Sequence, residues 1–282
     1  KALADYNFMQ RQYSKSIKIA PDYSEPLDVL YEDGDLLAIS KPAGVSSCPA
    51  HRTSTDSMVN RAIAHLEGGT PHVLHRLDWG TSGTLLFAKN VLAAREVAQQ
   101  FRARKTEKSY LALLLGSPEA DSFECALRIA KHPVNRDMSA VVRPEDLLDE
   151  EADAAVTVKR GMHEVHPEDV NGNPAQSAHT RFEVLARGTH ATACLVRPVT
   201  GRMHQIRVHA EALGHPLAGD EQYGLDMQPT ELNCSRMLLH AYELCVVHPM
   251  RQERMCFKSP LPEIFIESAV LLGVPEEALR AL

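Results

Sequence analysis

The sequence lacks any run of about eighteen apolar residues, the length that a membrane-spanning helix requires, so we expect no transmembrane helix and no membrane partner. It also lacks a C-x-x-C pair, although it contains six cysteines: Cys48, Cys125, Cys194, Cys234, Cys245 and Cys256. Scattered cysteines favour reduced thiols in a cytoplasmic protein over a disulfide framework or a zinc site. Because the first residue is Lys1 rather than Met, the loss of an organellar targeting segment stays open.

The chain has no excess of positive charge, and its formal net charge of −7 argues at first against an RNA-binding surface. The distribution of charge matters more than the sum. Six negative charges lie within nine positions, and without them the net charge would be −1. A local basic groove is therefore compatible with this composition. The six are Glu145, Asp146, Asp149, Glu150, Glu151 and Asp153.

The length of 282 residues, with 44% hydrophobic and 24% charged residues, is enough for one large domain or two small ones. Residues 1–22 are polar and without periodicity, so we expect an N-terminal arm there. Residues from about 140 to 178 combine the acidic run with Gly, Asn and Pro, which predicts a long loop or insertion. His163 and His166 in this stretch have no compact ligand spacing, which favours a surface role over metal binding.

Apolar patterning predicts several elements along the chain. Residues 27–31 and 36–40 read as strands joined by a tight turn that contains Asp33-Gly34. Residues 56–67 fit a helix with Asp56 as N-cap. A second helix over 91–104 would bury Val91, Ala94, Ala98 and Phe101, which fall at helical spacings. Further strands are expected over 109–115, 180–185 and 192–197, and a helical piece over 262–282.

The segment from His75 to Lys89 places one carboxylate, Asp78, two residues after Arg76 and directly before a turn-forming Gly-Thr-Ser-Gly stretch. Residues 84–88 then read as a short buried strand. Asp78 therefore lies on a turn that leads into the core, a place where functional carboxylates are common. From these residues alone, an Asp that only caps the turn is an equally good interpretation.

A second segment, residues 200–216, carries Ile206, Ala210 and Leu213 on one helical face, with Gly214 as a C′ residue. It presents Arg207 on a rigid helix. The structural alternative for Arg207 is an exposed pair with Glu211, one turn later, worth a few tenths of a kcal/mol.

The His75–Lys89 segment resembles the signature H-R-L-D-x-x-T-S-G-x-L-L-F-A-K of the RluA-type pseudouridine synthases, and every fixed position of that signature is present. Other segments are similar to further elements of the family: K-P-A-G at 41–44, K-x-Y-x-A at 108–112, G-R-x-H-Q-I-R-x-H at 201–209 and G-H-P-x-x-G-D-x-x-Y-G at 214–224. The resemblance runs from about residue 28 to about residue 260.

The fold that the resemblance implies is α+β, the pseudouridine synthase fold. It is a bent, mostly antiparallel mixed sheet flanked by helices, with a central active-site cleft, and would form one catalytic domain over residues 23–282. The small extra RNA-binding domain that many relatives carry at the N-terminus does not fit into residues 1–22.

The activity that the resemblance implies is the isomerisation of specific uridines in structured ribosomal or transfer RNA. Asp78 would be the catalytic aspartate, Arg207 its ion-pair partner, and Tyr110 an aromatic side chain under the base. The target uridine must leave its stack by base flipping, because its glycosidic bond is otherwise out of reach. The residues expected to bind substrate are Lys41, His75, Arg76, Thr81, Ser82, Gly83, Arg202, His204 and Gln205.

The resemblance leaves the chemical route open, because Asp78 could attack the anomeric carbon, attack the uracil ring or assist glycal formation. We expect no metal and no cofactor, since the isomerisation involves no net oxidation or hydrolysis, and we expect a monomer. Two alternatives remain, a catalytically inactive synthase-like RNA-binding protein and an RNA hydrolase. A hydrolase would need a second acid/base group or a metal cluster.

Overall fold

The computed structural model describes residues 19–51, 53–135, 137–142, 175–228 and 234–282. The predicted acidic loop at 145–153, the histidines at 163 and 166 and most of the predicted arm at 1–22 lie outside these ranges. The chain forms two compact units, each assembled from separate stretches of sequence. The first unit comprises residues 1–108 and 240–261, and the second comprises residues 109–239 and 262–282.

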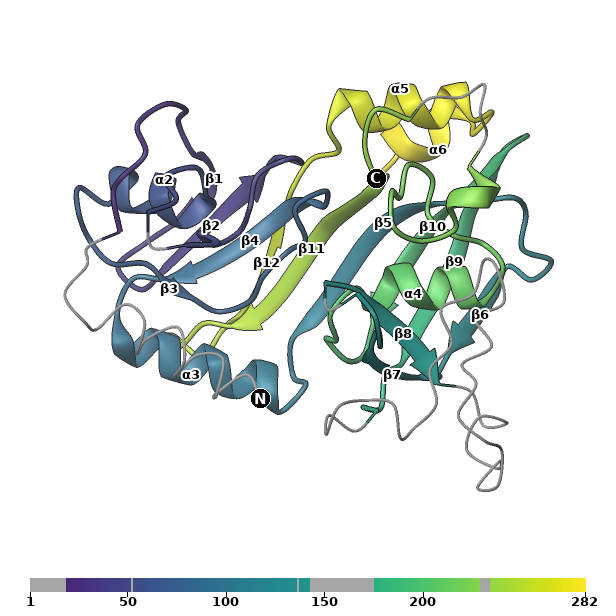
Figure 1. The fold of residues 1–282 in the computed structure, drawn as a ribbon. Coiled ribbons are helices and arrows are strands. Elements are labelled where there is room, and N and C mark those ends of the chain that lie inside the picture. Colours follow the sequence, from purple (N-terminus) through teal and green to yellow (C-terminus); the bar gives the residue numbers. More distant parts are fainter. Residues whose placement is uncertain (1–18, 52, 136, 143–174, 229–233) are drawn as a thin grey trace. The chain divides into compact units, whose positions relative to one another are not determined.

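The first unit is built on a sheet in which β1 (Asp28–Glu32), β2 (Leu36–Lys41), β4 (Ser82–Ala88) and β11 (Leu239–Val247) follow one another (Figure 1). β12 (Arg254–Lys258) pairs with β11, and the short β3 (His72–Val73) pairs with β4. The pairing of β4 with β11 is parallel, and the other pairings of this unit are antiparallel. The predicted hairpin over 27–40 is confirmed by the β1–β2 ladder.

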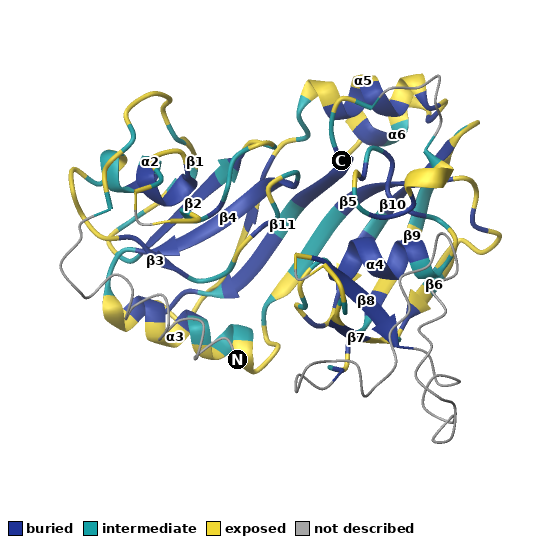
Figure 2. Ribbon diagram, viewed as in Figure 1, coloured by how far each residue is buried: buried dark blue, intermediate teal, exposed yellow. Residues whose placement is uncertain are grey.

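Strand β4 is the centre of the first unit, and each of its seven residues is buried (Figure 2). The parallel contact with β11 is possible because Gly83 has no side chain. A Cβ at Gly83 would lie 2.3 Å from the carbonyl oxygen of Ala241, and Gly83 has a φ of +114°. Gly83, which follows the turn that carries Asp78, is thus fixed tightly against β11.

Helix α3 (Val91–Arg102) packs on the core that β2, β4, β11 and β12 form, through a face that overlaps the predicted one. Ala94 is buried as predicted and Phe101 packs against the same core, whereas Val91 is 62% exposed and the other buried residues are Ala93 and Val97. The prediction placed Val91 in the core because it is apolar and three residues before Ala94. Val91 is the first residue of the helix, directly after the N-cap Asn90, and its side chain remains outside the core.

Helix α2 (Met58–His65) begins one residue later than predicted, with Ser57 rather than Asp56 as N-cap. The Ser57 hydroxyl accepts from the backbone N–H of Asn60, and the Asn60 side chain accepts from the backbone N–H of Ser57. This reciprocal pair satisfies two N–H groups at once, and a lone Asp cap satisfies fewer.

The second unit contains the antiparallel strands β5 (Glu107–Leu115, of which Ser109 onward belongs here), β10 (Ala191–Pro198), β9 (Thr180–Arg187) and β6 (Ser122–Cys125). A separate hairpin joins β7 (Arg128–Lys131) and β8 (Ser139–Val142). The strands predicted over 109–115, 180–185 and 192–197 are confirmed. This unit also contains the short 3-10 helix η3 (Leu225–Met227) and the C-terminal helices α5 (Glu263–Leu271) and α6 (Glu276–Arg280). Helices α5 and α6 confirm the helical piece predicted over 262–282.

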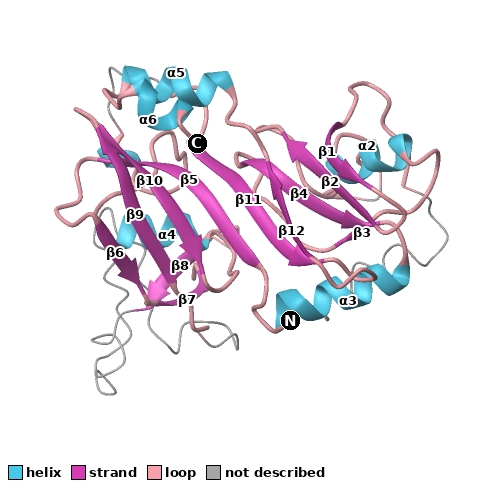
Figure 3. Ribbon diagram, turned by 180° about the vertical axis from the view of Figure 1, so that it is seen from behind, coloured by secondary structure: helices cyan, strands magenta, loops and turns pink. Residues whose placement is uncertain are grey.

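Helix α4 (Gln205–Ala212) covers one face of the second unit's sheet and lies behind the strands in the reverse view (Figure 3). Ile206 and Ala210 enter a core cluster with residues of β5, β9 and β10, as the predicted apolar face requires. Gly214 follows the end of the helix with a φ of +81°, which confirms it as the C′ residue. All residues from Gln205 to Glu211 are buried, including three that can carry charge.

The strands of the two units and the helices that pack on them make the fold α+β and mostly antiparallel, as expected. In the described part of the chain no helix combines the length and the apolarity needed to span a bilayer.

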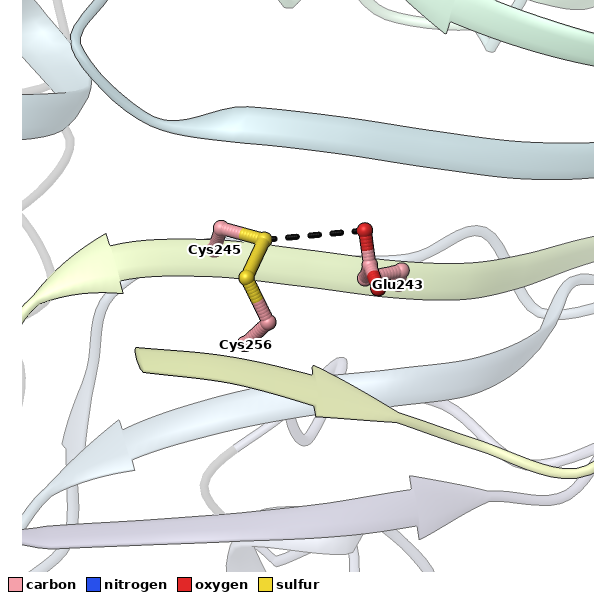
Figure 4. Close-up of side chains that lie close together, drawn as sticks. All are labelled: Glu243, Cys245 and Cys256. Atoms are coloured by element: carbon pink, nitrogen blue, oxygen red, sulfur yellow. Dashed lines mark hydrogen bonds between the residues drawn. A yellow bond between two sulfur atoms is a disulfide. The ribbon is translucent and has the colours of Figure 1, made fainter. Parts of the chain in front are cut away.

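The expectation of six reduced thiols is wrong at one place. Cys245 of β11 and Cys256 of β12 form a disulfide, with Cα atoms 4.0 Å apart, and Glu243 lies beside them (Figure 4). The two cysteines are eleven positions apart in sequence but face each other in the antiparallel ladder. Cysteine spacing alone could not reveal this register. The other four cysteines, Cys48, Cys125, Cys194 and Cys234, are not joined in a disulfide.

Candidate active-site loop

The loop that carries Asp78 is fixed to the protein on both sides of that residue. On one side, the Ser47 hydroxyl donates to the carbonyl of Leu77 at 2.7 Å and accepts from its N–H at 2.9 Å. On the other side, the carbonyl of Trp79 accepts from the N–H of Gly44 at 2.8 Å. Leu77 is buried, while Asp78 is half-buried between these anchors. The carboxylate is therefore held by a rigid backbone at the surface of the first unit.

Lys41 is a central support of this loop. Its ammonium group donates to the carbonyls of Pro42 at 2.8 Å, Val45 at 2.6 Å and Trp79 at 3.3 Å, and the residue is 0% exposed. A charged group in this position is tolerated because carbonyl oxygens replace its water. The expectation from sequence, that Lys41 binds substrate, assumed an accessible side chain. The structure instead makes Lys41 a buried tie between the K-P-A-G turn and the Asp78 loop.

His75 is a structural residue at the start of the loop. Its ring stacks on Phe101 at 5.3 Å, and its Nε2 accepts from the backbone N–H of Leu86 at 3.1 Å. Burial, together with the charge of Lys108, lowers the pKa of His75 to about 3, so the ring is neutral at physiological pH. Burial also lowers the pKa of Lys108 to about 8.

The residues after Asp78 are packed rather than open. Thr81 closes a turn by donating its N–H to the carbonyl of Asp78 at 3.1 Å. Its hydroxyl is buried without a hydrogen-bond partner in the described structure. The Ser82 hydroxyl lies 2.8 Å from Nδ1 of the buried His240, whose Nε2 lies 3.0 Å from the carbonyl of Ser259. Because a carbonyl only accepts, Nε2 carries the hydrogen and Ser82 donates to Nδ1.

Two side chains of the loop face solvent, one on each side of Asp78. Arg76 is exposed, and Trp79 is 63% exposed. Neither side chain makes a hydrogen bond or ion pair with any described residue. The guanidinium and the indole are therefore available to an external ligand, whereas Leu77 and Thr81 are not.

In the second unit, Arg207 is buried and bound to Asp220. Its Nε and Nη2 donate to the two carboxylate oxygens of Asp220 at 2.7 Å each, and Nη2 also donates to Gln222 at 2.7 Å. The guanidinium lies 4.9 Å from the centre of the Tyr223 ring. The exposed pair with Glu211, considered as the alternative from sequence, is wrong, because both residues are only 6% exposed and the carboxylate that Arg207 engages bidentately is Asp220.

The neighbours of Arg207 in the G-R-x-H-Q-I-R-x-H segment are also engaged within the second unit. Gln205 accepts from Thr200 and from the N–H of Arg202, and its amide N–H groups donate to His179 and Thr180. Arg202 donates to Gln176 and to the carbonyl of Ser177. His204 has a left-handed backbone with a φ of 55°, and its Nδ1 lies 3.0 Å from the Tyr223 hydroxyl. Gln205 is therefore a structural residue of this turn.

Tyr110 of β5 is half-buried and packs against the core cluster of the second unit, opposite Val196 in the sheet. Tyr110 and Arg207 belong to the second unit and Asp78 to the first. The pairing of Asp78 with Arg207, and the position of the Tyr110 ring near the carboxylate, stay predictions.

Two groups of side chains in the described part of the chain have metal-ligand composition. In one, Cys245 and Cys256 are joined by the disulfide beside Glu243. In the other, Asp33 accepts from the Tyr31 hydroxyl, His248, Arg251 and two backbone N–H groups. Burial alone would raise the pKa of Asp33, but the Tyr31 bond and the other donors outweigh it and lower that pKa. Asp33 thus ties the β1–β2 turn to the β11–β12 turn.

Sequence comparison matches residues 35–212 to the family described as RNA pseudouridylate synthase. This match includes Asp78 and Arg207 and covers more than half of the chain. The chain belongs to the RNA pseudouridylate synthase family. It is accordingly an RNA pseudouridine synthase, an isomerase by class.

Relatives of known name agree with this assignment. The dual-specificity RNA pseudouridine synthase RluA of Haemophilus influenzae is 34% identical over 245 residues, which cover 86% of this chain and 97% of the relative. The ribosomal large subunit pseudouridine synthase D of Nitrosomonas europaea is 34% identical over 247 residues, which span 84% of this chain but only 63% of the relative. Among solved structures, human RNA pseudouridylate synthase domain containing 1 has a TM-score of 0.63 at 25% identity and covers 93% of this chain and 98% of its own.

Proposed function

We propose that this synthase isomerises specific uridines in structured ribosomal or transfer RNA, with Asp78 as the catalytic carboxylate. The observation that carries the proposal is the mounting of Asp78. Its neighbours Leu77 and Trp79 are anchored by Ser47 and Gly44, so the half-buried carboxylate is presented on a rigid turn. Rigid presentation is what a nucleophile or proton acceptor needs, because misplacement by about 1 Å can cost 100-fold in rate.

Asp78 must be ionised to act in any of the three routes considered. Partial burial disfavours the carboxylate, and a paired guanidinium favours it. We propose Arg207 as that partner. A guanidinium has five N–H donors, so one Arg can serve two carboxylates. In Arg207, Nε and Nη2 donate to Asp220, and Nη2 also donates to Gln222. The buried Asp220 would then fix the direction of Arg207 before RNA binds.

The substrate uridine would be flipped out of its stack, with the Tyr110 ring under the base and Arg76 ordering the displaced nucleotide. Arg76 suits this role because it is exposed and has no hydrogen-bond or ion-pair partner among the described residues. The uracil must then detach, rotate and bond to the ribose through carbon 5, whose proton leaves last. Ribosomal RNA is favoured as a substrate by the name of one relative, and the name of another describes it as dual-specificity, so we include transfer RNA as a second candidate.

The test is release of tritium from bulk ribosomal or transfer RNA labelled at uracil carbon 5. We expect release by the purified protein, and we expect Asp78→Asn to abolish it, since the amide is nearly isosteric but cannot act as an anionic nucleophile or base. Asp28→Asn, at an exposed aspartate of β1, is the matched control and should keep full activity. Near-normal release by Asp78→Asn would refute the role of Asp78. Bound but unchanged RNA would favour the inactive RNA-binding protein, and cleaved RNA would favour the hydrolase.

A further inference from the structure

Trp79 is an exposed aromatic side chain directly beside the proposed catalytic residue. It is the single tryptophan of the chain, and it is 63% exposed. Isolated exposed apolar residues are common on proteins, so exposure by itself indicates no site. Trp79 differs because its backbone is held in place within the Asp78 loop and its ring lies beside the K-P-A-G turn.

The backbone of Trp79 is held by two donors, since its carbonyl accepts from the Gly44 N–H at 2.8 Å and from the Lys41 ammonium at 3.3 Å. The ring lies over the K-P-A-G turn, where a Cβ built on Gly44 would be 3.7 Å from Cζ2 of the indole. The turn therefore fixes the backbone of Trp79 and adjoins one edge of the indole, while the residue as a whole is largely exposed. Little backbone freedom is left for a ligand to remove on binding.

The chemistry of an exposed and supported indole is stacking. Nucleobases of any sequence offer a π-face, and aromatic platforms in single-stranded RNA sites contribute about 5- to 100-fold in affinity per base. Flipping one uridine also removes the stacking partner of the base next to it. An aromatic face one residue from the catalytic carboxylate can replace that lost partner.

We propose that Trp79 is a stacking platform for a nucleobase adjacent to the target uridine, and so a substrate-positioning residue. The inference rests on the proposed function of the Asp78 loop. The indole would hold the strand in register while Asp78 acts on the flipped nucleotide. Because stacking is tolerant of base identity, Trp79 would contribute affinity and register rather than sequence selection.

Trp79 supplies its own reporter, because no other tryptophan contributes to the fluorescence of this chain. The probe is a single-stranded oligouridylate of about 12 nucleotides, within the site sizes seen for such proteins. We expect saturable quenching of the fluorescence of the intact protein. For the variants, which lack the tryptophan, binding is followed through a fluorescent label on the RNA. We expect Trp79→Ala to weaken binding about 10-fold or more and Trp79→Phe to retain most of the affinity. Trp79→Leu should bind as weakly as Trp79→Ala.

Two controls separate stacking from general effects. Tyr23 is a 76% exposed aromatic of the same unit outside the loop, and Tyr23→Ala should bind as the unsubstituted protein does. The affinity ratio between the unsubstituted protein and Trp79→Ala should also stay constant as salt rises, because stacking releases no counterions, whereas loss of a phosphate contact changes the salt slope.

The outcomes also separate this inference from the proposed function. If Trp79→Ala or Trp79→Leu binds oligouridylate as tightly as the unsubstituted protein, and tritium release still depends on Asp78, then the stacking role is wrong and the synthase assignment stands. If Trp79→Ala weakens binding and Asp78→Asn stops release without weakening binding, both stand. Unchanged fluorescence at saturating RNA would also overturn the stacking role.

Discussion

Helix α4 buries side chains that usually lie in solvent because they carry charge. Arg207 and Glu211 are both charged by type and are both buried, a rare situation unless each has a partner. Arg207 has the carboxylate of Asp220. Glu211 accepts from the N–H of Gly224 at 3.0 Å. Burial, with repulsion from Asp220 and Asp226, raises the pKa of Glu211 to about 7 despite that bond and despite Arg207.

The raised pKa of Glu211 predicts that the free energy of unfolding falls as the pH rises. The folded protein keeps this proton up to about pH 7, whereas the unfolded chain releases it near its ordinary value of 4.5. The stability contributed by protonated Glu211 is thus present below pH 4.5 and is lost as pH rises to 7. Glu211→Gln keeps an acceptor for Gly224 and has no charge. We expect Glu211→Gln to stabilise the protein more at pH 8 than at pH 5. The two gains in the free energy of unfolding should differ by on the order of 1–3 kcal/mol.

Urea unfolding at the two pH values measures this difference. Glu221→Gln, at an exposed carboxylate of the same unit, should change stability equally little at both. An equal gain from Glu211→Gln at pH 5 and pH 8 would show that Glu211 is ionised throughout.

At the scale of elements, the β11–β12 ladder determines what the cysteines do. Antiparallel register places Cys245 opposite Cys256, and Glu243 opposite Lys258. Cys245 is buried and Cys256 is exposed, so the disulfide is reachable from solvent. β11 also carries His240, and Ser259 directly follows β12; His240 bonds to both Ser259 and Ser82, and so supports Ser82 behind the Asp78 turn.

The disulfide predicts four reactive thiols in the denatured protein before reduction and six after it. The disulfide links two residues eleven positions apart and so restricts the unfolded chain. Its reduction should therefore lower the free energy of unfolding by about 2–3 kcal/mol. The measurement is urea unfolding with and without a dithiol reductant. Cys256→Ser should be destabilised similarly and should not respond to the reductant. Six thiols without reduction would show that the sulfurs are not bonded in solution.

At the scale of the whole molecule, an acidic chain must bind a polyanion through a local surface. Arg76, Arg102, Arg104 and Lys105 are exposed residues of the first unit, whereas Lys41, expected from sequence to bind substrate, is buried. The proposed RNA-binding surface therefore consists of the four exposed residues. Their contribution should be electrostatic and salt-dependent.

We expect RNA affinity to fall steeply with salt, with a slope of about −0.7 in log affinity per phosphate neutralised on a single strand. Reversing the charges of Arg102 and Arg104 together should weaken binding and flatten that slope while the protein stays folded. Deleting residues 145–153 is the control and should change the slope little if that segment lies away from the surface. An RNA affinity that does not change with salt would show that RNA binds elsewhere. Unchanged RNA binding after the charges of Arg102 and Arg104 are reversed would show the same.

The sequence by itself determined the local features of this protein. The β1–β2 hairpin, three strands of the second unit (β5, β9 and β10), the end of α4 at Gly214 and the buried strand after Asp78 follow from local patterns in the sequence. Hydrophobic period and turn chemistry act at that range, and a folding chain satisfies them locally. The family motif identified the same loop, and its family is confirmed.

Only the tertiary structure decided which side chains are accessible and which partners they have. Lys41 is a buried tie, Arg207 binds Asp220, and Cys245 meets Cys256, although none of these follows from spacing. Partners of this kind come from separate strands and loops, so their meeting depends on register and packing over long separations. Burial then sets the electrostatics, because removing water turns the same carboxylate or ammonium from a solvated charge into a group that must be bonded or neutralised.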